Sequence, residues 1–244
     1  MRLAGRHALV TGGGTGIGAA ITRALAAEGA RITIVGRRPE PIAAVAQEVG
    51  GVAISADVTD RLAIDHAFGK ACSAHGPIEI LVNNAGVAAS ERFGRVTPEL
   101  WRETMAVNLD AVYLCSHWVW AEMFRAEWGR IVTIASNAGL RGYPYVAAYV
   151  AAKHGAVGLM RALAAEFAGT GITCNAICPG FADTEIVAEA VRTLREKTGR
   201  SEAEARAVLA RYNASGELVA PSRIAEAVVE LVLSDRSGEA VEIA

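Results

Sequence analysis

The sequence lacks an excess of charge of one sign and a long apolar run. Its 24 Lys and Arg residues nearly balance 26 Asp and Glu residues, for a net charge of −2. Without a strongly basic field there is no general attraction for nucleic acid, so we expect no nucleic-acid partner. The apolar segment Leu109–Phe124 is interrupted by Asp110, His117 and Glu122. No stretch reaches the roughly 18 unbroken apolar residues of a membrane span, and we expect no membrane partner either.

The sequence also has few cysteines and no C-x-x-C pair. Its four cysteines are Cys72, Cys115, Cys174 and Cys178. Such spacing favours reduced, buried thiols over a disulfide framework or a metal site, and we expect no metal. A strand-like run begins by His7, which leaves no room for a signal peptide ahead of it. These features predict a cytoplasmic location.

The sequence is rich in apolar residues, and these residues are arranged in a regular pattern. Hydrophobic residues make up 52% of the 244 positions and charged residues 20%, so a large core can form. Short β-branched runs alternate with longer helical patterns, which is typical of a mainly parallel sheet covered by helices on both faces. No linker rich in Pro, Ser or Gly divides the chain. We therefore predict a single α/β domain spanning residues 1–244, with a doubly wound parallel sheet of about seven strands.

Most of the predicted strands are apolar throughout, which is the pattern of strands buried on both faces. They are Ala8–Val10, Arg31–Val35, Val52–Ser55, Ile78–Val82, Gly129–Ala135, Ile172–Ile177 and Ala240–Ile243. The predicted helices are Gly16–Glu28, Pro39–Val49, Arg61–His75, an interrupted Pro98–Phe124, Tyr149–Phe167, Thr184–Lys197, Ser201–Tyr212 and Ser222–Leu233.

One segment departs from the alternation of strands and helices. Residues 184–215 form a long, polar, helical insertion before the last predicted helix. Such a segment is either a solvated pair of helices or a lid over a substrate pocket. If it is a lid, its basic residues Arg192, Arg195, Lys197 and Arg200 could meet the phosphates of an acyl carrier.

A glycine-rich turn, Thr11–Gly18, follows the first predicted strand and leads directly into a helix. Glycines let a pyrophosphate approach the backbone, and the helix N-terminus offers that anion free N–H groups and partial positive charge. The spacing of the glycines is looser than G-x-G-x-x-G, but the turn stands after a strand, as a dinucleotide site requires. The predicted contacts are Gly12, Gly14, Thr15, Gly16, Ile17 and Gly18.

Two arginines follow the second predicted strand. Gly36 stands where an acidic residue would accept the ribose 2′-hydroxyl, and Arg37 and Arg38 come next. Guanidinium groups without a neighbouring carboxylate suit a 2′-phosphate. We therefore expect NADP(H) to be preferred over NAD(H). Use of NAD(H), with two arginines that are merely exposed on a loop, is the alternative.

Tyr149 and Lys153 are four residues apart in a helix-forming stretch, so they share one face of the helix. A neighbouring ammonium lowers the pKa of a tyrosine from about 10, which suits general acid–base catalysis. The pair alone also fits an ordinary surface helix. Ser136 and the segment Asn83–Gly86 stand at the carboxyl ends of predicted strands, where ligands bind in open α/β sheets.

These motifs together resemble the classical short-chain dehydrogenase/reductase family, across nearly the whole chain and in the family's order. The segments Val107–Leu109 and Pro179–Gly180 match as well. The resemblance implies a Rossmann-like fold. It also implies that Tyr149 passes a proton to or from the substrate oxygen and that Lys153 binds the nicotinamide ribose and lowers the tyrosine pKa.

The resemblance further implies that Ser136 binds the substrate carbonyl and that Asn108 holds a water in a proton relay behind Lys153. The implied cofactor contacts are Arg37, Arg38, Asp57, Val58, Asn84, Ala85, Gly86, Tyr149, Lys153, Pro179, Gly180 and Thr184.

The implied activity is hydride transfer between NADP(H) and a secondary alcohol/ketone pair, and the substrate resembles that of 3-oxoacyl thioester reductases and polyketide-type ketoreductases. The alternatives are an NAD(H)-dependent dehydrogenase of a small cyclic or aromatic alcohol, a dinucleotide-binding sensor without catalysis, and an epimerase or dehydratase. Members of the family are commonly tetramers built through segments equivalent to Pro98–Phe124 and Tyr149–Phe167. We therefore expect a homotetramer.

Overall fold

The computed structural model describes the backbone of residues 1–244 and every side chain except that of Ile186. Seven strands form one parallel sheet in the order β3-β2-β1-β4-β5-β6-β7. The order reverses between β1 and β4, which is where open α/β sheets bind ligands. The strands are β1 (His7–Thr11), β2 (Arg31–Gly36), β3 (Val52–Ser55), β4 (Ile80–Asn83), β5 (Gly129–Ile134), β6 (Ile172–Pro179) and β7 (Ala240–Ile243).

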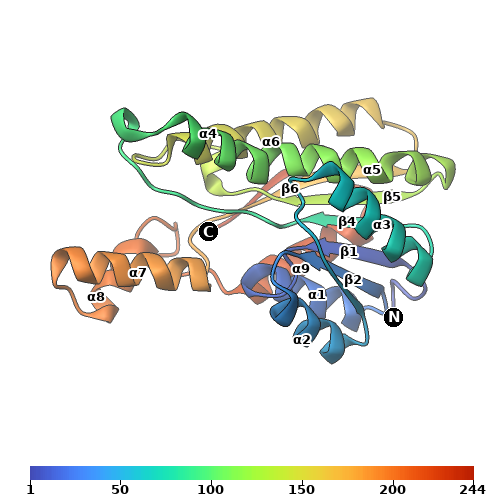
Figure 1. Ribbon diagram of the computed structural model, residues 1–244, viewed down its shortest axis with the longest axis horizontal. Helices are drawn as coiled ribbons and strands as arrows, with labels where there is room; N and C mark the ends of the chain where they lie inside the picture. The colour runs from blue at the N-terminus through green and yellow to red at the C-terminus, as the bar shows by residue number, and fades with distance from the viewer.

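Helices cover both faces of this sheet (Figure 1). One face carries α1 (Gly16–Ala27), α2 (Pro39–Val49) and α9 (Pro221–Leu233). The other carries α3 (Arg61–His75), α4 (Pro98–Met105), α5 (Ala111–Arg125) and α6 (Ala147–Glu166). Two further helices, α7 (Glu185–Thr198) and α8 (Glu202–Ala210), extend away from the sheet at one end.

The central strand β1 contributes apolar side chains to two hydrophobic cores, one on each face of the sheet. Ala8 and Val10 point to the core beneath α1, α2 and α9. Leu9 points to the opposite core beneath α3, α5 and α6. Successive side chains of a strand face opposite sides, so a strand between two helical layers must be apolar throughout. Among the described residues, no helix has both the length and the apolar character that crossing a membrane demands.

The predicted doubly wound parallel sheet is confirmed, and each predicted strand and helix is present with shifts of a few residues at its ends. The predicted interruption of Pro98–Phe124 takes a particular form. A π-helical segment, Ala106–Asp110, joins α4 to α5 without breaking the path of the backbone. Such segments insert an extra residue into a helix and are frequent at functional sites.

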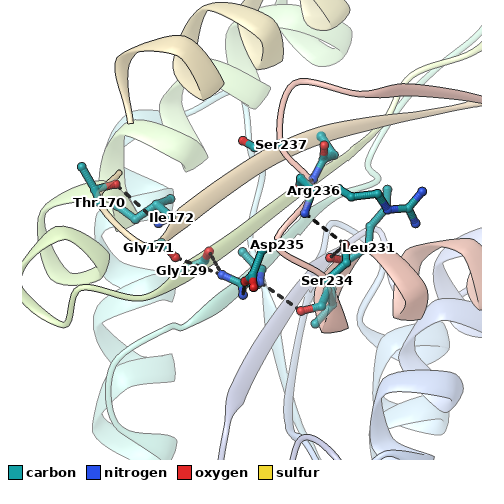
Figure 2. A network of polar contacts seen from close by, with 12 residues as sticks. Gly129, Thr170, Gly171, Ile172, Leu231, Ser234, Asp235, Arg236 and Ser237 are labelled. Carbon is teal, nitrogen blue, oxygen red and sulfur yellow. Dashed lines mark hydrogen bonds and ion pairs between the residues drawn. The ribbon is translucent and has the colours of Figure 1, made fainter. Parts of the chain in front are cut away.

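A buried arginine fixes the amino-terminal end of the sheet, opposite the glycine-rich turn. Arg130 of β5 donates from Nη1 to the carbonyls of Gly129 and Gly171, each at 3.0 Å, and from Nε to the carbonyl of Val232 at 3.0 Å. Its Nη2 donates to Asp235 at 2.9 Å. Figure 2 shows this region, with Gly129 and Gly171 on one side and Asp235 on the other. One guanidinium therefore joins β5, the turn before β6 and the end of α9.

His7, at the start of β1, is buried, and its burial predicts that the folded protein is destabilised by acid. Its Nδ1–H donates to the Gly76 carbonyl at 2.8 Å, and its Nε2 accepts from the Thr33 hydroxyl at 2.9 Å. Burial is the main cause that lowers the pKa of His7, and the nearby His75 and Arg31 add to it. The folded protein therefore binds fewer protons than the unfolded chain, whose histidine pKa is near 6.5.

The stability that depends on neutral His7 is complete above about pH 6.5 and is lost as the pH falls through the lower pKa of the folded state. We expect the free energy of unfolding, measured with urea, to decrease less between pH 7 and pH 5 in His7→Gln than in the parent protein. The exposed His66 of α3 provides the control, because His66→Gln should retain the parent's pH dependence. Equal pH dependence in all three proteins would contradict the assignment.

Candidate active site

The glycine-rich turn is built for close approach of a ligand to the backbone. Gly12 and Gly16 have positive φ angles of 65° and 51°, which residues with a Cβ rarely adopt. A Cβ on Gly18 would lie 2.2 Å from the Gly12 carbonyl oxygen. Thr15 precedes α1 without a side-chain cap, and the first turn of α1 has no acidic residue.

The N-terminus of α1 is therefore open to an anion. Among the described residues, none accepts a hydrogen bond from the backbone N–H of Gly16, Ile17 or Gly18. Unpaired N–H groups at the end of a 12-residue helix suit a phosphate. The geometry of the turn therefore fits the pyrophosphate of a dinucleotide.

The turn is held in place by two side chains. The Thr11 hydroxyl accepts from the backbone N–H groups of Asn84 and Ala85, at 3.0 and 3.1 Å. The Asn84 side-chain amide donates to the carbonyls of Thr11 and Gly12, at 3.0 and 3.1 Å. The carboxyl ends of β1 and β4 are thereby joined. The sequence predicts Asn84 only as a cofactor contact and gives no indication of the structural role of Thr11.

The residues predicted at the adenosine end lie around β2 and β3. Arg38 precedes α2, and its Nη2 lies 3.8 Å from an oxygen of Glu185 in α7. Asp57 accepts hydrogen bonds from the N–H and hydroxyl of Thr59, at 2.9 and 2.8 Å. Burial acts to raise the pKa of Asp57, but these hydrogen bonds and the charge of Arg37 outweigh it and lower the pKa. Val58 beside it is buried in the core.

Ser136, Tyr149 and Lys153 come together at the carboxyl ends of β5 and β6. Ser136 follows β5, and its hydroxyl accepts from the Ala138 N–H at 3.1 Å. Tyr149 and Lys153 lie on the first turns of α6. Lys153 is only 4% exposed, and its Nζ donates to the Ile134 carbonyl at 2.9 Å. The structure thus brings together three residues that are spread over positions 136 to 153 of the sequence.

The pKa values of this group differ from the sequence-based expectation. Burial raises the pKa of Tyr149, and the hydrogen bond with Ser136, which acts in the opposite direction, does not offset it. Burial also lowers the pKa of Lys153 to about 8. Lys153 is not among the causes that shift the pKa of Tyr149, so the expected lowering by Lys153 stays a prediction. Its Nζ is directed to the Ile134 carbonyl and lies 5.6 Å from the centre of the tyrosine ring.

The consequence is that the phenol is held protonated at neutral pH. A protonated phenol beside a serine hydroxyl can donate to a carbonyl oxygen, which is the role of a general acid. The same geometry therefore suits the reductive direction of a carbonyl/alcohol reaction.

Asn108 lies in the π-helical segment and is fully buried. Its Nδ2 donates to the carbonyls of Val87 and Thr104, both at 3.0 Å, and its Oδ1 accepts from the Val87 N–H at 3.3 Å. A Cβ on Gly86 would lie 3.0 Å from Asn108 Oδ1 and 3.6 Å from Lys153 Nζ. Asn108 therefore holds the segment after β4 beside Lys153. Its role in a water relay stays a prediction.

Of the predicted contacts, Pro179 ends β6 and Gly180 follows it, and a residue that the sequence did not point to holds the next residue, Phe181. The buried Asn213 accepts from the Phe181 N–H at 2.7 Å and donates to the carbonyls of Phe181 and Glu217, at 2.9 and 2.6 Å. A Cβ on Gly180 would lie 2.1 Å from Asn213 Oδ1. Asn213 thus joins the two ends of the helical insertion. A lone asparagine in a polar segment carries no sequence signal for this.

Thr184, predicted on the nicotinamide side, precedes α7. Its Cγ2 lies 3.3 Å from the position that a Cβ on Gly16 would occupy. Among the described residues, no group of three or more His, Cys, Asp or Glu side chains is placed to hold a metal ion.

Fold and site together define a nicotinamide-dinucleotide-dependent oxidoreductase. The chain belongs to the short chain dehydrogenase family, whose family model matches residues 6–195. The family and fold predictions are thereby confirmed.

Individual proteins support this assignment. The chain is 38% identical over 238 residues to a D-beta-hydroxybutyrate dehydrogenase of Cupriavidus necator, covering 94% of this chain and 91% of that protein. It is 43% identical over 183 residues to an acetoacetyl-CoA reductase of Rhizobium meliloti, covering 75% and 76%. A crystal structure of an actinorhodin polyketide ketoreductase variant with NADPH matches with a TM-score of 0.94 and 31% identity, covering 100% of this chain and 97% of that one.

Proposed function

We propose that the protein reversibly transfers a hydride between NADP(H) and a secondary alcohol/ketone pair of the 3-hydroxyacyl/3-oxoacyl class. The observation that carries this proposal is the convergence of Ser136, Tyr149 and Lys153 in a fold whose α1 N-terminus is uncapped. The substrate class is supported by the similarity to proteins named for hydroxybutyrate and acetoacetyl-CoA.

Each side chain has a part in this reaction. When bound, NADP(H) supplies or accepts the hydride. Tyr149 donates a proton to the carbonyl oxygen in reduction and accepts it back in oxidation. Ser136 donates a hydrogen bond to the same oxygen, where negative charge develops. Lys153 holds the nicotinamide ribose, and Asn108 keeps the segment around Gly86 in position behind it.

An assay of nicotinamide absorbance tests this proposal directly. NADPH and NADH are each offered with acetoacetyl-CoA, free 3-oxo acids and small cyclic or aromatic ketones. Oxidation of NADPH by the 3-oxoacyl compounds supports the proposal. Turnover only of the cyclic or aromatic ketones supports the alternative substrate class. Binding of dinucleotide without turnover of any ketone would support the sensor alternative.

The preference for NADP(H) is part of the proposal. It is supported by the exposed Arg37 and Arg38 and by a neighbour crystallised with NADPH. We expect Arg37→Asp to reduce the ratio of kcat/KM for NADPH to that for NADH by about 10- to 100-fold, since hydrogen bonds to charged groups contribute about 1.5–3 kcal/mol. Arg102→Asp, on the exposed face of α4, is the control and should leave the ratio unchanged. An unchanged ratio in Arg37→Asp would remove Arg37 from the cofactor site.

We also propose that the chain is one domain and that residues 184–215 act as a substrate lid. The lid's base is fixed by Asn213, and aromatic rings join it to the segment after β5. The Tyr212 ring centre lies 5.5 Å from that of Phe181 and 6.3 Å from that of Tyr143. Within the lid, Arg192 pairs with Glu189, and Arg195 lies 3.5 Å from Glu202. These ion pairs occupy two of the lid's basic residues, which would have to leave their carboxylates to bind the phosphates of an acyl carrier. The lid's basic residues are therefore only weak support for an acyl-carrier substrate.

We also propose that the protein is a homotetramer and that it is located in the cytoplasm. Tyr113, Trp120 and Phe124 are half-exposed along α5. A cavity of about 320 Å³ lies between α5 and α6, lined in part by Tyr113, Trp120 and Leu159. An apolar hollow on these two helices supports association through them. The four cysteines are free thiols, which supports a reducing compartment.

A further inference from the structure

An ion pair joins Arg38, one of the two arginines expected at the cofactor site, to Glu185 at the start of the lid. Arg38 Nη2 lies 3.8 Å from Glu185 Oε2, and the two side chains are 66% and 73% exposed. Glu185 is the first residue of α7, directly after Thr184. Thr184 in turn lies against the glycine-rich turn at Gly16. The first turn of the lid therefore lies beside both the glycine-rich turn and Arg38, which is expected to bind the 2′-phosphate.

The two arginines face different carboxylates. The Arg37 carbonyl accepts from the Ser55 hydroxyl at 3.2 Å, and the charge of Arg37 acts on Asp57. Asp57 is already held by Thr59. Glu185 is instead an exposed carboxylate at the start of α7, with Oε2 at ion-pair distance from the guanidinium of Arg38.

We infer that Glu185 competes with the 2′-phosphate of NADP(H) for Arg38 and so limits the discrimination between NADP(H) and NAD(H). This inference rests on the proposed function. Carboxylates and phosphates are both ligands of the guanidinium fork. A phosphate placed on Arg38 would also bring a second anion close to Glu185, and like charges at such distances repel. NADP(H) must therefore separate the pair, whereas NAD(H), with a 2′-hydroxyl, leaves it intact.

The expected effect is a gain in affinity when the carboxylate is neutralised. We expect Glu185→Gln to lower the Kd for NADPH roughly three- to tenfold, because an exposed ion pair and a like-charge repulsion are both weak at the surface. The Kd for NADH should change less than about 1.5-fold, since no charge is added at Arg38. The gain for NADPH should fall below about twofold in 0.5 M NaCl, where surface charges are screened.

The experiment measures binding alone, by nucleotide fluorescence without substrate. The variants are Glu185→Gln, Arg38→Ala, the two combined, and Glu189→Gln as a matched control. Glu189 lies on the same helix and pairs with Arg192 instead, so its loss changes net charge equally. We expect no gain from Glu189→Gln, and less than a twofold gain from Glu185→Gln when Arg38 is already alanine.

The outcomes separate this inference from the proposed function. If neither dinucleotide binds, the proposed function is wrong. If Arg38→Ala leaves NADPH affinity unchanged, Arg38 does not hold the 2′-phosphate and the inference is overturned, while a site at Arg37 stands. If the parent prefers NADPH through Arg38 but Glu185→Gln leaves its Kd within twofold, the inference is overturned and the proposed function stands. Equal gains for NADPH and NADH, or an equal gain from Glu189→Gln, also overturn it.

Discussion

Replacing Tyr149 by phenylalanine is expected to lower kcat for ketone reduction by about 10²- to 10⁴-fold, the usual contribution of a positioned acid–base group. The change removes the phenolic hydroxyl, whose pKa is influenced by Ser136, and leaves the ring in place. The ring, whose centre lies 5.6 Å from Lys153 Nζ, is retained by the substitution. The Kd for NADPH should therefore stay within about twofold of the parent value.

Tyr145→Phe is the matched control, because Tyr145 lies four residues earlier with an exposed side chain. It removes the same hydroxyl from the same segment, and its kcat should equal that of the parent. Substrate reduction and NADPH binding are measured on all three proteins. If Tyr149→Phe reduced ketones at the parent rate, the phenol would not be the proton donor, and Lys153 or Ser136 would have to be tested next.

Features that depend on local pattern were predictable from the sequence. The apolar runs predicted that β1 and β4 to β6 are strands buried on both faces. The glycines of Thr11–Gly18 predicted a tight turn, and the structure has such a turn, with positive φ at Gly12 and Gly16. The spacing of Tyr149 and Lys153 placed both on one helix. These follow from periodicity and backbone sterics, which a single segment determines.

Features that depend on contacts between distant segments were not predictable. The pKa of Tyr149 depends on burial in the folded chain, and its direction is opposite to the one expected from Lys153 alone. Asn213 acquires its role only when Phe181 and Glu217 lie next to it in the folded chain. Asn108 of the π-helical segment Ala106–Asp110 bonds the Val87 backbone, a contact between segments about 20 residues apart in the sequence. In each case, tertiary packing overrides or adds to what local sequence dictates.

Replacing Arg130 by alanine is expected to lower the free energy of unfolding by roughly 3–5 kcal/mol, the largest stability effect that we expect. The side chain of Arg130 is 6% exposed, and it donates to three backbone carbonyls besides Asp235. Its guanidinium carbon also lies 4.5 Å from the centre of the Trp128 ring. Alanine would remove these contacts together and leave acceptors short of donors, each costing about 1–3 kcal/mol without full additivity.

Two further variants show which contacts matter. Asp235→Asn removes the ion pair alone and should cost less than about 1 kcal/mol, because the Asp235 side chain is 98% exposed and its charge is already solvated. Arg130→Lys keeps the charge but loses the planar fork that reaches several carbonyls at once, so its cost should lie between the other two. Urea unfolding at one fixed protein concentration measures all three values. A loss in Arg130→Ala no larger than that in Asp235→Asn would mean that the carbonyl contacts contribute little and that the ion pair is the relevant interaction.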